Sequence, residues 1–238
     1  MDDRRVLLAL ETSQRQQSIA VALGDGVMHC ESVETNDRMV DDLMPAIDRA
    51  FQKLSIGPMQ LRAVLLNAGP GGFTGLRIAH AAAQAIAIAT GAHIVQVGAA
   101  ACARQASCDA GDIVGDDAVW VALASKGEEA WVARVHATDN AMCESGESIS
   151  AAQWQPRGAS LLIADEHLPA AWRSRAQAEN IRLIPLRVHA SAVIKAGMPL
   201  LAQGLHTPPE AAIPIYPREA EAVRLWRQRH AVRTDGTA

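Results

Sequence analysis

A glycine-rich loop joins a buried strand to a long helix between residues 61 and 90, and this unit constrains the fold most. Leu61–Leu66 is a continuous apolar run, typical of a buried strand. The loop after it contains one proline and four glycines: Gly69, Pro70, Gly71, Gly72 and Gly75. A helix is predicted over residues 74–90, with Thr74 as its N-cap. Such a loop either offers backbone N–H groups to a phosphate or makes a tight turn that lets the helix pack closely.

The loop departs from both standard nucleotide-binding patterns. A Walker loop ends in Gly-Lys-Ser/Thr, and this loop has no lysine. In the Rossmann pattern G-x-G-x-x-G, two residues separate the second glycine from the third. Gly69 and Gly71 fit the first two glycines, but Gly75 comes one position too late to be the third. The sequence is therefore compatible with both interpretations of the loop, a tight structural turn and a phosphate-binding site.

The helix predicted over residues 74–90 is apolar on nearly every side. Alanines make most of its surface smooth, and Leu76, Ile78, Ile86 and Ile88 spread larger groups around it. A helix of this kind is either fully buried or shared with another chain. Arg77, His80 and Gln84 interrupt it, which argues against a membrane span.

Residues 69–87, GPGGFTGLRIAHAAAQAIA, resemble the GPGSFTGLRIG signature of the bacterial TsaB (YeaZ) family. Leu7–Ser13, Leu43–Pro45 and Ile215–Arg218 resemble, in the same order, the family's opening strand, its first-helix motif and its C-terminal Tyr-x-Arg segment. The middle of the chain matches only in pattern. Members of this family are non-catalytic partner subunits of the machinery that makes N6-threonylcarbamoyladenosine in tRNA.

The resemblance implies a two-lobed α/β fold of the actin/sugar-kinase/Hsp70 (ASKHA) type, with mixed sheets flanked by helices and a divergent C-terminal lobe. We expect an N-terminal lobe with the partner-binding helices at 1–108, a C-terminal lobe at 109–217, and a basic helix or tail at 218–238. Strand–turn–strand patterns near the start of both lobes indicate a duplicated architecture.

A second helix is predicted over residues 36–54, where apolar residues recur at spacings of three and four. Pro45 should either kink this helix or mark where it becomes regular. The resemblance implies that both helices form a surface for a second copy or for the TsaD-type paralogue. The expected interface residues are Val40, Leu43, Met44, Ile47, Phe51, Leu76, Arg77, Ala79, His80, Ala83 and Ala87. In the alternative, both apolar faces cover the protein's own sheet.

In the ASKHA fold the first hairpin turn approaches nucleotide phosphates. The candidate nucleotide contacts are therefore Glu11, Thr12, Ser13, Gly69, Gly71 and Gly72. Ala124 stands where the family usually has an aspartate, so a carboxylate suited to Mg²⁺ is missing. We expect no tightly bound cofactor and little independent ATP hydrolysis, with any ATP or ADP and Mg²⁺ at an interface shared with other subunits. In the alternative, the polar residues at 11–13 merely end a strand.

Several chemistries lack support in the sequence. The eight histidines never fall at the i, i+4 spacing of a helical metal site, and no GxSxG elbow is present. We therefore expect no metal ligands and assign no catalytic residue. A net charge of −4 argues against broad nucleic-acid binding by the chain alone. The tail at 218–233 has a net charge of +3. This charge is suited to contact with tRNA or with an acidic partner, and it is also typical of a solvated amphipathic helix.

The acidic start of the sequence is unlike a signal peptide, and the four cysteines form no CxxC pair, so we expect a cytoplasmic protein with reduced thiols and no membrane contact. The leading hypothesis is a scaffold subunit that binds and activates a TsaD-type threonylcarbamoyltransferase. A TsaE-type ATPase would be a further partner, the free chain could form a homodimer, and tRNA would be reached only through the complex. The alternatives are an active ASKHA-fold ATPase or small-molecule kinase and, with less support, a peptidase.

Overall fold

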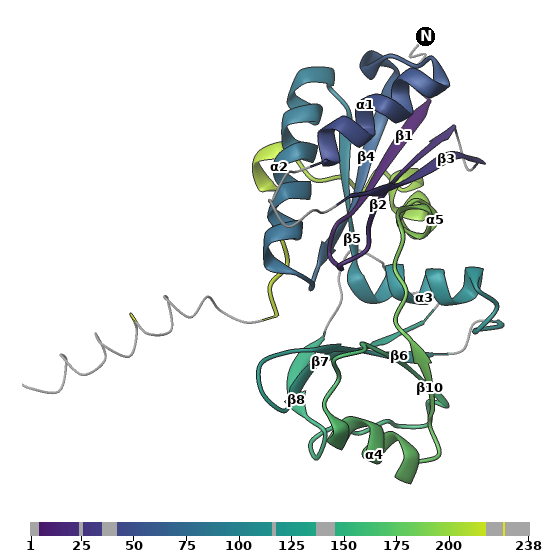
Figure 1. Cartoon of the computed structure of the whole chain (residues 1–238), viewed down its shortest axis with the longest axis vertical. Helices are drawn as coiled ribbons and strands as arrows, with labels where there is room; N and C mark the ends of the chain where they lie inside the picture. The colour runs from purple at the N-terminus through teal and green to yellow at the C-terminus, as the bar shows by residue number, and fades with distance from the viewer. Residues whose placement is uncertain are drawn as a thin grey trace, which may run out of the picture.

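The computed structural model describes residues 5–23, 26–34, 42–115, 118–136, 146–217 and Trp226. They form two lobes, each built on a five-stranded sheet (Figure 1). The elements are β1 (Val6–Glu11), β2 (Gln17–Leu23), β3 (Gly26–Val33), α1 (Leu43–Leu54), β4 (Leu61–Gly69), α2 (Phe73–Thr90), β5 (His93–Gly98), α3 (Ala99–Asp109), β6 (Val119–Ala124), β7 (Glu129–Val135), β8 (Glu147–Ser150), β9 (Leu161–Ala164), α4 (Ala170–Ala178), β10 (Arg182–Pro185) and α5 (Ala190–Ala202). Two short 3₁₀ turns lie at Pro58–Gln60 and Pro209–Ala211.

The two sheets repeat one topology. The first has the strand order β3-β2-β1-β4-β5, and the second has the corresponding order β8-β7-β6-β9-β10. In each sheet the first three strands along the chain pair antiparallel in succession. The fourth strand pairs parallel with the first, and the fifth pairs parallel with the fourth. The expected two-lobed fold of mixed sheets is therefore confirmed, and so is its internal duplication.

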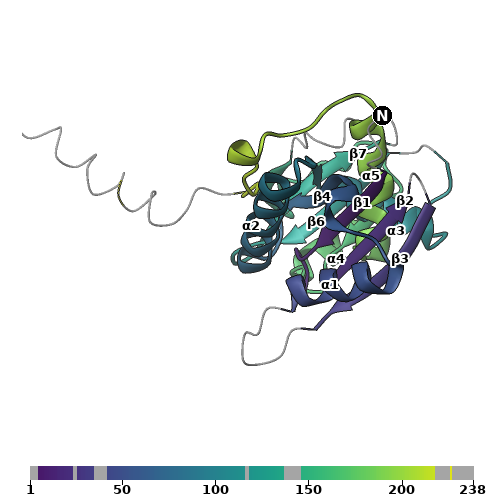
Figure 2. The ribbon, with the colours of Figure 1, turned by 90° about the horizontal axis from the view of Figure 1, so that it is seen from above.

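The first sheet is buried on both faces because β1 carries apolar residues on both sides. Leu8 and Leu10 contribute to a core shared with α1 and α2, whereas Leu7 and Ala9 contribute to a core shared with α5. Figure 2 shows α1 and α5 on opposite sides of this sheet. The helix α5 belongs to the range 109–217 expected for the second lobe, yet it packs on the first sheet. Its apolar residues cover the face of the first sheet that lies opposite α1 and α2.

The structure shows where the helices α1 and α2 begin, and only one of the two starts agrees with the sequence analysis. The helix α1 begins at Leu43 with Pro45 in its first turn, so the proline lies where the regular helix starts. Residues 35–41, which include Val40, lie outside the described part of the chain. The expected N-cap at Thr74 is wrong: α2 begins at Phe73, and Gly72 occupies the N-cap without a side-chain hydrogen bond.

Within the described ranges, no helix combines the length and hydrophobicity needed to cross a membrane. Cys30, Cys102 and Cys108 form no disulfide within these ranges, and Cys143 lies outside them. The basic tail expected at 218–238 also lies outside them, apart from Trp226.

A larger residue at Gly197 should destabilise the first lobe. A Cβ atom there would lie 2.5 Å from Leu65 Cδ2 and 2.9 Å from Val97 Cγ2, since α5 packs closely on the sheet. We expect Gly197→Leu to lower the free energy of unfolding by about 1–3 kcal/mol, the usual cost of overpacking a core. Urea unfolding measures this, and Ala202→Leu, at an exposed position of the same helix, is the control. Equal stability of the two variants would contradict close packing at Gly197.

Candidate functional site

Most of the expected interface residues lie in the protein's own core. The buried ones are Leu43, Ile47, Phe51, Leu76, Ala79, His80, Ala83 and Ala87. Of the expected residues within the described ranges, only Met44 and Arg77 are exposed. The inner faces of both helices therefore cover the first sheet, as the alternative interpretation holds. A partner on this side of the molecule would meet Met44 and Arg77 together with exposed side chains outside the expected set.

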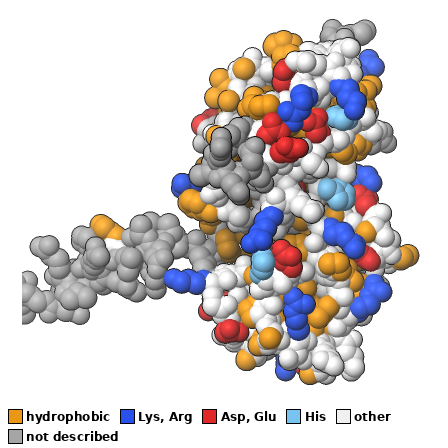
Figure 3. Space-filling view, in the orientation of Figure 1, with side chains coloured by type: hydrophobic (Ala, Val, Ile, Leu, Met, Phe, Trp, Pro, Cys, Tyr) orange, Lys and Arg blue, Asp and Glu red, His pale blue; other side chains and the backbone are white. Residues whose placement is uncertain are grey.

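The opposite side of α2 carries a continuous exposed stripe, which we call the outer α2 face: Phe73, Arg77, Ala81, Ala85 and Ile88. These residues are spaced by three or four and so lie on one side of the helix. Phe73 is 52% exposed and Ile88 is 75% exposed. Arg77 is the only Asp, Glu, Lys or Arg in the helix. In Figure 3, hydrophobic side chains gather beside α2, and charged side chains, which include the Arg49 ion pairs with Glu31 and Asp42, lie over α1.

A C-terminal strap, residues 207–216, runs along α2 and β5. Two side-chain amides hold it: Gln84 Nε2 donates to the carbonyls of Pro209 and Ala212, both at 2.9 Å, and Gln96 Nε2 donates to the carbonyl of Ile213 at 2.8 Å. The sequence patterns did not identify Gln84 and Gln96 as strap contacts, because their partners lie more than 100 positions away in the sequence.

The strap ends against the start of α2. The backbone N–H of Ile215 donates to the carbonyl of Ala68 at 2.7 Å. The next residue, Tyr216, has its ring centroid 5.2 Å from that of Phe73. The strap therefore adds an aromatic side chain to one end of the outer α2 face. The Ile215–Arg218 motif of the sequence gave the only hint of this contact.

Two of the candidate nucleotide contacts, Glu11 and Ser13, hydrogen-bond to each other. Glu11 is fully buried, and its Oε1 accepts from Ser13 N at 2.7 Å and Ser13 Oγ at 2.5 Å. Its Oε2 accepts from Asn67 Nδ2 at 2.8 Å. Burial raises the pKa of Glu11 above its ordinary value, and the hydrogen bonds from Ser13 and Asn67 offset only part of that rise. Asn67 was not among the predicted site residues, although it sits in a buried strand where a polar side chain needs partners.

The glycine loop lies directly on this turn. Gly72 N donates to the carbonyl of Ser13 at 2.8 Å, and Thr12 Oγ1 donates to the carbonyl of Gly75 at 2.7 Å. A Cβ atom at Gly75 would lie 1.9 Å from Thr12 O, and one at Gly71 would lie 2.6 Å from Ser13 Cβ. Glycine is thus required for close approach, and the tight-turn interpretation of the loop accounts for these contacts.

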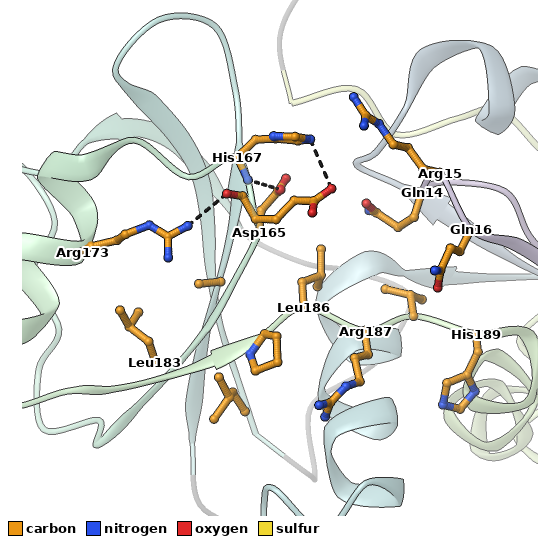
Figure 4. A pocket seen from close by; sticks show the side chains of 15 residues that line it. Gln14, Arg15, Gln16, Asp165, His167, Arg173, Leu183, Leu186, Arg187 and His189 are labelled. Carbon is orange, nitrogen blue, oxygen red and sulfur yellow. Dashed lines mark hydrogen bonds and ion pairs between the residues drawn. The ribbon is translucent and has the colours of Figure 1, made fainter.

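A pocket of about 860 Å³ lies between the lobes (Figure 4). The turn Gln14–Gln16 lines it from the first lobe, and residues 164–167 and 183–189 line it from the second. None of the six candidate nucleotide contacts lines this pocket. Asp165 Oδ2 accepts from the backbone N–H of Ala124 at 3.1 Å, so a carboxylate that the sequence patterns missed lies beside position 124.

The charges around this pocket are mixed. Three arginines line it, together with Asp165 and Glu166. Arg187 is paired with Asp112 at 2.5 Å, and Arg173 donates to the carbonyl of Glu166 at 3.0 Å. The pocket therefore presents both positively and negatively charged side chains to a small polar ligand. Among the residues that the structure describes, no three His, Cys, Asp or Glu side chains come together as metal ligands.

Replacing Glu11 with glutamine should change how stability depends on pH. Since the pKa of Glu11 is raised in the folded state, the native protein keeps a proton that the unfolded chain releases near its ordinary pKa of 4.5. The wild type therefore loses stability as the pH rises from about 4.5 through the folded pKa, and the glutamine variant lacks this titration. We expect the stability of the wild type relative to Glu11→Gln to fall over this range in urea titrations.

The exposed Glu128→Gln is the charge-matched control for that experiment. If the relative stability of the wild type instead rose with pH, the hydrogen bonds from Ser13 and Asn67 would outweigh the cost of burying the carboxylate.

Comparisons with known proteins agree with this architecture. The family model of TsaD, tRNA N6-adenosine threonylcarbamoyltransferase, matches residues 19–115. The structure of YeaZ from Pseudomonas aeruginosa is similar with a TM-score of 0.70 and 21% identity, over 89% of this chain and 99% of that one. A second Pseudomonas aeruginosa structure, described as an uncharacterized protein with similarity to peptidase YEAZ, gives a TM-score of 0.69 and 21% identity over 90% and 100%. No curated protein matches significantly. The chain thus adopts the YeaZ fold, which supports the TsaB (YeaZ) resemblance of its sequence.

Proposed function

We propose that this chain is a non-catalytic partner subunit that binds and activates a TsaD-type threonylcarbamoyltransferase acting on tRNA. The observation that carries the proposal is the outer α2 face, which is exposed and nearly uncharged in a chain with the YeaZ fold. Contiguous apolar surface of this kind is typical of protein-binding sites. Burying it against a partner would release about 25 cal/mol for each Å² removed from water.

The shape of the outer α2 face suits a helix from another chain. Ala81 and Ala85 lie between the larger Phe73 and Ile88, so a partner helix could approach closely at the middle and pack against a large side chain at each end. Met44 on α1 is a further apolar side chain of the first lobe and is 48% exposed. A second copy of the chain could use the same face, so we propose that a homodimer competes with the TsaD-type complex. A TsaE-type ATPase and tRNA would join through that complex.

An active ASKHA-fold ATPase or kinase is the alternative, and the inter-lobe pocket is the feature that favours it. Against it, Glu11 and Ser13 hydrogen-bond to each other and to Asn67, and none of the six candidate nucleotide contacts lines this pocket. Any ATP or ADP with Mg²⁺ would then bind at an interface shared with other subunits. Calorimetry with Mg-ATP on the isolated chain tests this alternative: sub-micromolar binding with steady turnover would support it over the scaffold role.

A carboxylate in the middle of the outer α2 face should prevent partner binding. We expect Ala85→Glu to weaken the complex with the cognate TsaD-type subunit by about 3 kcal/mol, the cost of burying an unpaired charge, or about 100-fold in Kd. Calorimetry on the purified pair measures this. Ala171→Glu, at an exposed position of α4 in the second lobe, is the matched control and should bind as the wild type does.

The same variants test the function in cells. After depletion of this protein, mass analysis of tRNA nucleosides should show loss of threonylcarbamoyladenosine. The Ala171→Glu variant should restore the nucleoside and Ala85→Glu should not. Unchanged nucleoside levels after depletion would refute the proposed function.

A further inference from the structure

The one charged residue of α2, Arg77, is held in place by two aromatic rings. Its Cζ lies 4.0 Å from the centroid of the Phe73 ring, one helical turn earlier. Its Nε donates to Tyr216 Oη at 3.3 Å. The Phe73 and Tyr216 rings meet at an interplanar angle of 35°. We call these three residues the anchor cluster.

The strap fixes the anchor cluster from outside α2. The hydrogen bonds of Ile213 O with Gln96 and of Ile215 N with Ala68 O determine where Tyr216 lies. An arginine that is already stacked loses less conformational freedom when it binds a carboxylate than one that is free to move. Arginine and tyrosine are also the residue types, with tryptophan, that most often dominate the binding energy of protein interfaces.

The charge of Arg77 is available to a partner. Its contacts are with the two aromatic side chains, and no carboxylate in the described ranges pairs with it. The residue is exposed, and Phe73 and Tyr216 beside it are 52% and 38% exposed. An exposed guanidinium held in a fixed position is suited to a bidentate contact with a carboxylate.

We propose that the anchor cluster selects the partner by receiving an aspartate or glutamate from an apolar helix of the TsaD-type subunit. This inference rests on the proposed function and names the chemistry of the partner at that site. A protein carboxylate fits better than an RNA phosphate, because RNA binding needs several cations and α2 supplies one. The rest of the outer α2 face is alanine and isoleucine, which suits an apolar helix.

The length of the stripe specifies the partner further. Arg77 and Ile88 are eleven positions apart in the sequence, which is roughly 16 Å along a helix. The partner helix should therefore carry an acidic residue about three turns from a large apolar residue, with small or apolar residues between them on the same side.

Binding of full-length variants to the cognate TsaD-type subunit, measured by calorimetry at two salt concentrations, tests the inference. We expect Arg77→Glu to weaken binding about 100-fold and Arg77→Lys about 10-fold, since lysine keeps the charge but loses the planar stacking. Arg134→Glu reverses a charge on an exposed residue of β7 in the second lobe and should leave Kd unchanged. A lysine in place of the partner's acidic residue should restore binding of Arg77→Glu.

The outcomes separate this inference from the proposed function. If Arg77→Glu bound as tightly as the wild type while Ala85→Glu failed to bind, the anchor cluster would be refuted and the partner role would stand. If both variants bound normally, the proposed function would fail as well. A gel-shift assay with tRNA covers the phosphate alternative: loss of tRNA binding by Arg77→Glu with an unchanged protein Kd would also overturn the inference.

Discussion

The contact between the glycine loop and the turn after β1 determines the position of α2, and the rest of the first lobe depends on it. Gly75 approaches Thr12 so closely that a Cβ atom would lie 1.9 Å from a backbone oxygen. Buried Glu11 orders the same turn through its hydrogen bonds with Ser13 and Asn67. With the first turn of the helix fixed in this way, Ala79 and the other buried residues of α2 face the sheet. The outer α2 face stays exposed.

The strap completes this arrangement from the far end of the chain. By accepting hydrogen bonds from Gln84 and Gln96, it covers the side of α2 next to β5. The outer face then remains as the exposed part of the helix. The second lobe repeats the strand order of the first but fills its core differently, with Trp154 and Trp172 fully buried, which fits the expected divergence of that lobe.

Sequence patterns predicted the elements of the first lobe well and the surface of α2 poorly. Strands such as β1 and β4 carry long apolar runs bounded by polar residues or glycine, so they are recognisable locally. In α2, alanines occupy both the inner and the outer stripe, so no periodicity separates core from surface. The expected interface therefore combined buried residues such as Leu76 and Ala83 with the exposed Arg77.

The sequence by itself determined the main strands and helices of the first lobe, and its motifs carry the family resemblance that implied a two-lobed fold. Local preferences of strands, turns and helices act over a few residues, so they predict these elements but not how the elements pack. Only the tertiary structure decided which stripe of α2 faces outward and that Tyr216 meets Phe73 and Arg77. The physical reason is that Arg77 and Tyr216 are 139 positions apart, and their contact arises from packing of the whole lobe.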